Sequence, residues 1–328
     1  MAALAIGYSF LMPYYLCMMA GIAMRLRMFM CSLERLLTVQ ELPQEAKAFS
    51  AEHDSKPGVW PLGGEIEFTN VSMKYQSHLP LTLKGVSFKI NAGESVGIVG
   101  RTGAGKSSLL ATLFRLVDSD CVTGHITIDG VDIHAVGLTT LRSRVAIIPQ
   151  EPTINAGTVR SNLDPFGGVS DEAIQIVLDR VGLAREFAAM AVDFGGTNLS
   201  AGERQLVCLA RTLVLKEADE ARFRIVCMDE STANLDFESD ESMRGLIKRT
   251  LKGRTTLIIA HRLNTIVDCD RVLVMDNGRV AEYDRPAQLL RDSGSVFYGM
   301  AEHLGGSAVA QLLAKAVAAE ETKKGGEM

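Results

Sequence analysis

The chain has 328 residues, of which 47% are hydrophobic, and this apolar content is enough to fill a core and excludes a disordered chain. Its net charge of −5 excludes the dense Lys and Arg face of nucleic-acid-binding proteins, so we expect no nucleic-acid partner. The six cysteines are scattered without a close pair, which is typical of reduced thiols and excludes a compact zinc or disulfide site.

The N-terminal segment is typical of a membrane helix. No charged residue occurs in residues 1–24, and the apolar run is long enough to cross a bilayer. Arg25 and Arg27 follow the run, whereas a signal peptide carries positive charge before it, and the positive-inside rule then places the remainder of the chain in the cytoplasm. A helix buried in a protein core is the alternative to a membrane helix for this segment. A single span cannot enclose a transport path, so transport would need further membrane helices.

We expect residues 1–40 to be the end of a transmembrane domain, with its last membrane helix at about residues 2–24, and residues 41–62 to be a linker because they are polar and interrupted by Pro and Gly. The folded domain is expected over residues 63–305, followed by a helical, then flexible tail over residues 306–328. Short β-branched runs alternate there with helical patterns, which predicts an α/β fold. The expected strands are residues 65–69, 86–90, 95–99, 144–148, 224–228, 255–260 and 271–275.

A glycine-rich turn follows the strand expected at residues 95–99 and precedes a helical run at residues 109–116. Its residues are Gly100, Arg101, Thr102, Gly103, Ala104, Gly105, Lys106, Ser107 and Ser108. This is a complete Walker A pattern between the strand and the helix that it requires. The glycines let backbone amides surround phosphates, Lys106 reaches the β- and γ-phosphates, and Ser107 ligates Mg²⁺. The pattern predicts a nucleoside triphosphate site.

Two carboxylates, Asp229 and Glu230, end the apolar strand expected at residues 224–228. Open α/β sheets place their ligands at the carboxyl ends of the strands. Asp229 would then hold Mg²⁺, usually through water, and Glu230 would act as the general base toward the attacking water. Taken alone, the acidic pair is equally compatible with a helix cap.

A third motif lies between these two and favours the nucleotide interpretation. It consists of Leu199, Ser200, Ala201, Gly202 and Glu203. The motif precedes a helical run at residues 206–215 and resembles the signature sequence of ABC transporters. In that family the signature serine and glycine lie at a helix N-terminus and grip the γ-phosphate bound by the opposite cassette. The resemblance therefore implies a second cassette as partner.

Four further positions match the same family in order along the chain. The resemblance makes Gln150 a Mg²⁺ ligand in the Q-loop, His261 a contact of the γ-phosphate, Asp236 part of the D-loop and Tyr75 the aromatic residue that stacks on adenine. Separately, a histidine at a strand end is more often a structural residue than a ligand contact, and a tyrosine on a sheet is compatible with a purely structural role. The order of the motifs removes this ambiguity for all but Tyr75.

Residues 100–109, 162–166, 204–211 and 260–266 carry a closer resemblance to the second cassette of the C subfamily, the multidrug-resistance-associated-protein type. It implies a mixed-sheet core, an antiparallel β subdomain and a helical subdomain behind one transmembrane helix. It also implies ATP and Mg²⁺ as cofactors, transmembrane domains as partners, and ATP-driven export of organic anions, conjugates or drugs. An ATP-binding regulatory module of a channel-type protein and a truncated fragment are the alternatives.

Two departures from the family pattern bear on activity. Glu203 stands where the signature usually has Gln, which puts a carboxylate near a phosphate and weakens that contact unless Arg204 screens it. The segment before the signature, expected to be helical over residues 171–198, is several residues shorter than is usual.

Overall fold

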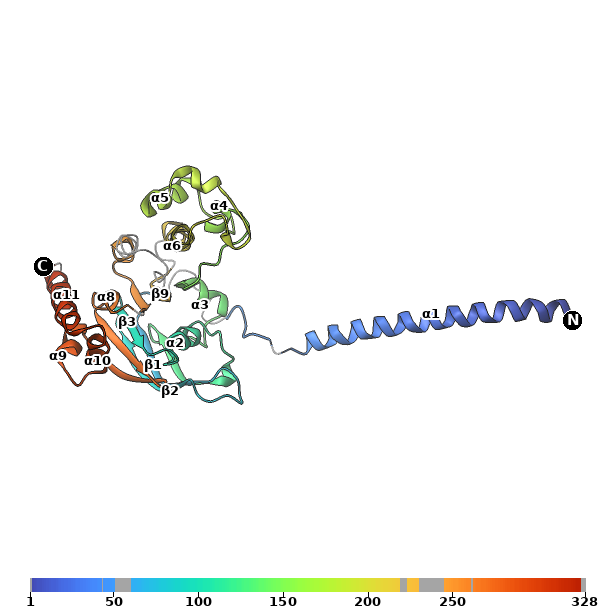
Figure 1. Ribbon diagram of the computed structural model, residues 1–328, viewed down its shortest axis with the longest axis horizontal. Coiled ribbons are helices and arrows are strands. Elements are labelled where there is room, and N and C mark those ends of the chain that lie inside the picture. The colour runs from blue at the N-terminus through green and yellow to red at the C-terminus, as the bar shows by residue number, and fades with distance from the viewer. Residues whose placement is uncertain are drawn as a thin grey trace. The chain divides into compact units, whose positions relative to one another are not determined.

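The computed structural model describes residues 2–42, 44–50, 60–218, 223–229, 245–260 and 262–325. The chain forms two compact units, Met1–Ala46 and Lys47–Met328, which are described separately below (Figure 1).

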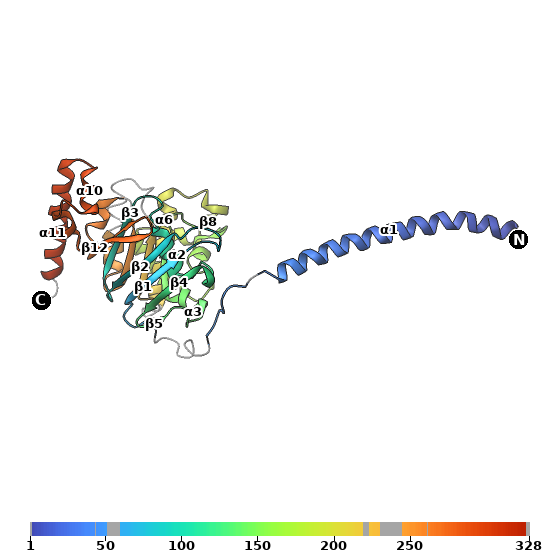
Figure 2. The same cartoon turned by 90° about the horizontal axis from the view of Figure 1, so that it is seen from below.

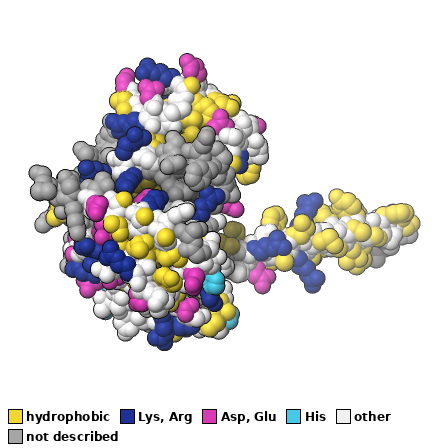
Figure 3. Space-filling view, turned by 60° about the vertical axis from the view of Figure 1, so that its left-hand side comes forward, with side chains coloured by type: hydrophobic (Ala, Val, Ile, Leu, Met, Phe, Trp, Pro, Cys, Tyr) yellow, Lys and Arg dark blue, Asp and Glu magenta, His cyan; other side chains and the backbone are white. Residues whose placement is uncertain are grey.

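The first unit contains one long helix, α1 (Ala2–Gln40), which runs through Pro13. Within the described residues, one helix, Ile6–Gln40, is long and apolar enough to cross a membrane. Figure 3 shows apolar side chains over the N-terminal part of α1, with basic side chains, all arginines, in the part that follows. The 39 residues of α1 extend about 58 Å, which exceeds a hydrocarbon core of about 30 Å. The apolar run and the charged stretch after it are therefore one continuous helix.

The second unit combines two main sheets with several groups of helices. Its strands are β1 (Ile66–Met73), β2 (Leu83–Ile90), β3 (Ser95–Gly100), β4 (Val122–Ile128), β5 (Val131–Asp132), β6 (Val145–Ile148), β7 (Gly157–Thr158), β8 (Ala191–Val192), β9 (Ile225–Asp229), β10 (Thr255–Ile259), β11 (Arg271–Asp276) and β12 (Arg279–Asp284). Its helices are α2 (Lys106–Leu113), α3 (Leu138–Arg144), α4 (Val159–Leu163), α5 (Asp171–Val181), α6 (Ala201–Ala218), α8 (Leu263–Ile266), α9 (Pro286–Arg291), α10 (Val296–Glu302) and α11 (Gly306–Gly325).

The larger sheet has the order β12-β11-β3-β10-β9-β6. Only its edge strand β12 is antiparallel to its neighbour; the other pairs are parallel. The smaller sheet, β2-β1-β4-β5, is antiparallel throughout. The predicted α/β class is confirmed, and each of the seven expected strands is present. Parallel neighbours bring their carboxyl ends to one edge of the sheet, which is where such folds bind ligands.

The larger sheet is buried on both faces, and strand β11 illustrates how. Leu273 and Met275 belong to a hydrophobic cluster with α2 and the smaller sheet, whereas Val272 and Val274 belong to a second cluster with α8 to α11. Successive side chains of a strand point to opposite faces, so alternating residues supply two cores. Helix α2 shares the first cluster with both sheets, and Figure 2 shows it beside β1 and β4.

The expectation of a helical segment over residues 171–198 is wrong beyond Val181. Helix α5 begins after Ser170, whose hydroxyl accepts a hydrogen bond from the Ala173 N–H (3.3 Å). It ends at Gly182, which has a left-handed φ of 77° and stops the helix. The remainder forms two 3₁₀ turns, residues 185–189 and 194–196, on either side of β8. Helices α4, α5 and α6 share a third hydrophobic cluster and lie together in Figure 1.

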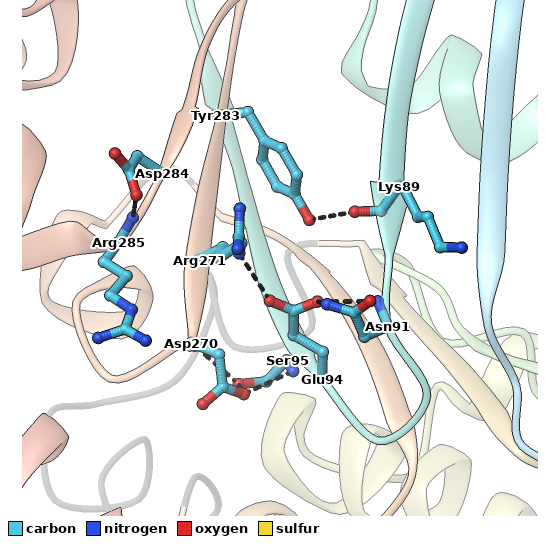
Figure 4. A network of polar contacts seen from close by, with 9 residues as sticks. All are labelled: Lys89, Asn91, Glu94, Ser95, Asp270, Arg271, Tyr283, Asp284 and Arg285. Carbon is cyan, nitrogen blue, oxygen red and sulfur yellow. Dashed lines mark hydrogen bonds and ion pairs between the residues drawn. The ribbon is translucent and has the colours of Figure 1, made fainter.

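A polar network fixes the start of β3 against the neighbouring strands (Figure 4). Ser95, the first residue of β3, donates its N–H and its hydroxyl to the Asp270 carboxylate, at 2.7 and 2.6 Å. Next to it, Glu94 pairs with Arg271 at 3.0 Å, and the Arg271 guanidinium lies 5.2 Å from the centre of the Tyr283 ring. Burial, assisted by the Glu94 charge, raises the pKa of the Tyr283 hydroxyl. The strand that leads into the glycine-rich loop is thus anchored at its beginning.

Candidate functional site

The glycine-rich loop lies between β3 and α2, and its shape depends on glycine. Gly100, Gly103 and Gly105 have positive φ angles of 154°, 82° and 101°, a region that other residues adopt only with strain. A Cβ on Gly100 would collide with the Met275 carbonyl of β11, and one on Gly105 would lie 2.9 Å from the Leu83 side chain. The loop therefore turns tightly against two strands, with Gly105 capping the start of α2.

Lys106 begins α2 and turns its side chain back over the loop. It is only 7% exposed, and its ammonium donates hydrogen bonds to the carbonyls of Gly100 (2.9 Å) and Arg101 (3.2 Å). Burial lowers the pKa of this ammonium, and the negative charge of Asp229 opposes that shift. Two neutral carbonyls compensate a buried cation poorly compared with a phosphate, which offers charged acceptors. The loop thus holds a cation where an anion would be stabilised.

The register of the larger sheet places Asp229 close to this loop. Asp229 ends β9 opposite Ile259 of β10, and Ile259 is in turn opposite Ile98 of β3. On the other side of β9, β6 ends at Ile148, so Gln150 follows at the same sheet edge and is exposed there. The structure therefore brings the loop, Asp229 and Gln150 to one edge, as expected for carboxyl ends of parallel strands.

The oxygen donors at this edge suit magnesium. Ser107 is exposed in the first turn of α2, and the Ser107 hydroxyl, the Asp229 carboxylate and the Gln150 amide are the hard donors that Mg²⁺ prefers. Among the described residues, no group of three His, Cys, Asp or Glu could hold a metal ion by itself. Magnesium typically relies on few protein ligands and completes its shell with water and substrate phosphates, so these residues fit it.

Three predicted site residues, Glu230, Asp236 and His261, lie outside the described residues. In sequence, Glu230 directly follows Asp229 at the end of β9, and His261 comes shortly after the last residue of β10. Their roles stay predictions.

Tyr75 lies shortly after β1 and is tied to α2. Its hydroxyl is 3.0 Å from the Ser108 hydroxyl, and half of the Tyr75 surface is exposed. The structure thus joins the predicted adenine-stacking residue to the helical turn that follows the glycine-rich loop. No sequence pattern indicated this contact, because the two residues are far apart along the chain and neither needs the other for its local structure.

The signature motif forms the N-terminus of α6. Ser200 and Glu203 form a reciprocal capping box: the Ser200 N–H donates to the Glu203 carboxylate (2.7 Å), and the Glu203 N–H donates to the Ser200 hydroxyl (3.2 Å). The hydrogen bonds that the carboxylate accepts from Ser200, chiefly from the backbone N–H, lower the pKa of Glu203. Arg204 directs its guanidinium to the carbonyls of Leu199 (2.5 Å) and Gly196 (3.3 Å). The Glu203 carboxylate therefore occupies the positive end of the helix, where an anion would bind.

The structure places the signature and the glycine-rich loop in different parts of the second unit. Leu199 belongs to the hydrophobic cluster of α4, α5 and α6, whereas Ala104 of the loop belongs to the cluster of α2 and the smaller sheet. The glycine-rich loop, Asp229 and Gln150 are thus gathered at one sheet edge, and Leu199 of the signature is part of a separate packing unit.

A pair of residues not predicted from the sequence ties the signature helix to the segment that follows Gln150. The Arg211 guanidinium, on α6, donates to the carbonyls of Asn162 (2.8 Å) and Thr153 (3.1 Å). Asn162 is buried and exchanges hydrogen bonds with the Asn155 backbone, both at 2.8 Å. The segment that follows Gln150 is therefore fastened to the signature helix. Both residues lie in segments that carried the family resemblance, which was the only sequence signal for them.

Comparisons with known proteins agree with this geometry. A family model described as ABC transporter matches residues 83–233. Metal resistance protein YCF1 of Saccharomyces cerevisiae is 40% identical over 312 residues, and the match covers 93% of this chain and 20% of that protein. Human ATP-binding cassette sub-family C member 3 is 42% identical over 311 residues, with 93% of this chain and 20% of that protein covered.

The yeast ATP-dependent bile acid permease is 40% identical over 305 residues, covering 85% of this chain and 18% of the relative. A solved bacterial Atm1-family ABC exporter with ATP bound superposes with a TM-score of 0.73 at 30% identity, covering 85% of this chain and 48% of that one. The chain spans only about a fifth of the length of these curated relatives. The motifs, the fold and these matches agree: the chain carries an ABC transporter nucleotide-binding cassette of the C-subfamily type.

Proposed function

We propose that this chain binds Mg-ATP on the loop from Gly100 to Ser108 and, together with a second cassette, hydrolyses it to power export across a membrane. The observation that carries the proposal is the buried ammonium of Lys106, which lies within the electrostatic influence of Asp229 at one sheet edge. An ammonium and a metal-binding carboxylate on either side of a phosphate loop are the groups that triphosphate and Mg²⁺ require.

Hydrolysis would use the water-activating carboxylate of Glu230, with His261 at the γ-phosphate, Asp236 in the D-loop and Gln150 in the Mg²⁺ shell. Proton transfer from the attacking water to Glu230 would accompany attack on the γ-phosphate. The signature of this chain belongs to a packing unit separate from the glycine-rich loop. The remaining face of the γ-phosphate would therefore be contacted by the signature of another cassette. We therefore infer that the chain alone binds ATP and that turnover needs two cassettes.

Export is supported by the relatives, whose names include an ATP-dependent bile acid permease and a metal resistance protein. Organic anions, conjugates or drugs are the proposed substrates, and the helices that would select them are proposed to come from transmembrane domains of which α1 is one helix. With α1 in the membrane, the positive charge that follows its apolar run supports a cytoplasmic cassette.

The test reconstitutes the whole chain in lipid nanodiscs, alone and mixed with the first-cassette half of a C-subfamily transporter. Alone, the chain should bind ATP only weakly in EDTA and better with Mg²⁺, and should release no phosphate above background. The mixture should hydrolyse ATP. Absence of ATP binding by the isolated chain would overturn the proposal, and phosphate release by the chain alone at the rate of the mixture would overturn the need for a second cassette.

A regulatory ATP-binding module is the second candidate, and the capping box at Glu203 favours it. The Glu203 carboxylate, with its lowered pKa, remains charged at neutral pH and would repel the γ-phosphate of a facing cassette. A weakened signature contact would slow ATP hydrolysis in the assembly. The chain would then bind ATP with little turnover, as a regulatory module does.

Glu203→Gln is expected to strengthen ATP-dependent association of the two cassettes by about 2- to 5-fold, the range of helix-terminus charge effects. Glutamine retains the carbonyl oxygen that accepts the Ser200 N–H (2.7 Å in the native chain), so the cap persists and only the charge is lost. Association is measured by light scattering or fluorescence transfer over an ATP titration. Glu302→Gln, at the exposed end of α10, is the matched control, and equal behaviour of the two variants would refute the repulsion.

A further inference from the structure

The bond between Tyr75 and Ser108 connects two ends of the proposed nucleotide site. Tyr75 follows β1 of the smaller sheet, whereas Ser108 lies in the first turn of α2, next to the residues proposed to hold phosphate and Mg²⁺. Their hydroxyl oxygens are 3.0 Å apart, which is within hydrogen-bonding distance. The contact therefore joins the element proposed to bind the base to the element proposed to bind the phosphates.

Ser108 and Tyr75 differ in conformational freedom. Ser108 is 5% exposed, and its carbonyl accepts a hydrogen bond from the Thr112 hydroxyl at 2.7 Å, so its backbone is held inside a helical turn. Tyr75 is 50% exposed and lies in an irregular segment, so its ring would otherwise be free to change rotamer. The hydrogen bond at the tip of the ring restrains this rotation while leaving half of the residue accessible.

We propose that Ser108 is a positioning residue for the nucleobase: it holds the Tyr75 ring in the orientation that stacks on adenine while Lys106 and Ser107 hold the phosphates. This inference rests on the proposed function. A restrained aromatic ring loses less conformational entropy when a base stacks on it, and preorganisation of this kind raises affinity. Stacking on an aromatic ring is tolerant of base identity, so Ser108 favours nucleotides over base-free phosphates without selecting among purines.

A double-mutant cycle on the whole chain tests the proposal, with Tyr75→Phe, Ser108→Ala and the double variant. Tyr75→Phe keeps the ring and removes only the hydroxyl. Each single variant is expected to weaken ATP binding by about 3- to 10-fold, the range for loss of one hydrogen bond, and the double variant should weaken it no further than the singles. The probes are ATP, GTP and inorganic tripolyphosphate, which has the phosphates without a base.

Tripolyphosphate affinity should be unchanged in Tyr75→Phe, which leaves the phosphate loop intact, and GTP affinity should fall with ATP affinity. Ser143→Ala, whose hydroxyl bonds within the exposed end of α3, is the control and should alter nothing. Additive effects of the two substitutions, or an equal loss of ATP and tripolyphosphate affinity in Tyr75→Phe, would overturn the inference while leaving ATP binding established. If Ser108→Ala lowers the unfolding temperature, the test relies on Tyr75→Phe alone. The ratio of ATP affinity to tripolyphosphate affinity should then fall in that variant, and an unchanged ratio would overturn the inference. A native chain that does not bind ATP would instead contradict the proposed function.

Discussion

Lys106→Met is expected to weaken ATP binding by about 100-fold, equivalent to roughly 2.7 kcal/mol. Methionine has a similar length and fits an apolar surrounding, so the substitution removes the ammonium without opening a large cavity. The native ammonium is buried and bonded only to two loop carbonyls in the contacts described above. A bound triphosphate would supply the charged partner that these carbonyls do not, and this gain disappears with the charge. Isothermal titration with Mg-ATP measures the loss.

The control for Lys106→Met is Lys315→Met, which removes the same charge from α11, where Lys315 pairs with Asp268 at 3.2 Å. This variant should bind ATP as the native chain does. Because Lys106 loses hydrogen bonds to the carbonyls of Gly100 and Arg101, the thermal unfolding of both variants is compared. A folded Lys106→Met chain with native ATP affinity would show that the glycine-rich loop is not the nucleotide site.

Glu230→Gln is expected to lower ATP turnover by the mixed cassettes by at least about 100-fold, the lower end of the range for general base catalysis. Glutamine is nearly isosteric but cannot accept a proton from water, so chemistry is lost while ATP binding stays within a few-fold of native. Phosphate release measures turnover. Radiolabelled ATP that stays bound to the mixed cassettes measures how much ATP is bound without being hydrolysed.

Glu302→Gln is again a suitable control for Glu230→Gln, because Glu302 is an exposed glutamate of α10. Its turnover should equal that of the native chain. If Glu230→Gln hydrolyses ATP at the native rate, Glu230 is not the general base, and the active composite site of the assembly is the one whose catalytic carboxylate comes from the other cassette.

Local patterns predicted the seven expected strands well because each is a short apolar run bounded by turn residues. Strand β3 and the glycine-rich loop illustrate this, since the expected strand at residues 95–99 differs from Ser95–Gly100 by a single residue. By contrast, β4 and β12 were not predicted. Their burial is irregular, and β12 has no fully buried residue, so their strand conformation depends on pairing with β1 and β11.

The helical expectation over residues 171–198 failed for a related reason. Up to Val181 the apolar residues recur with helical spacing and become the buried face of α5. Gly182 then stops the helix, and β8 is stabilised by pairing with β7, a partner that lies well before it in the sequence. Helix propensity is a weak determinant where such a pairing is available.

The amino-acid sequence by itself was enough to predict a nucleotide site in this protein, because the glycine-rich loop, the signature and the acidic strand end are contiguous motifs whose shape depends on their own local backbone. Tertiary structure alone decided which side chains meet across the chain. It paired Tyr75 with Ser108 and directed the Arg211 guanidinium to the Asn162 carbonyl. Such contacts depend on packing and rotamer direction, which the spacing of residues along a chain does not specify.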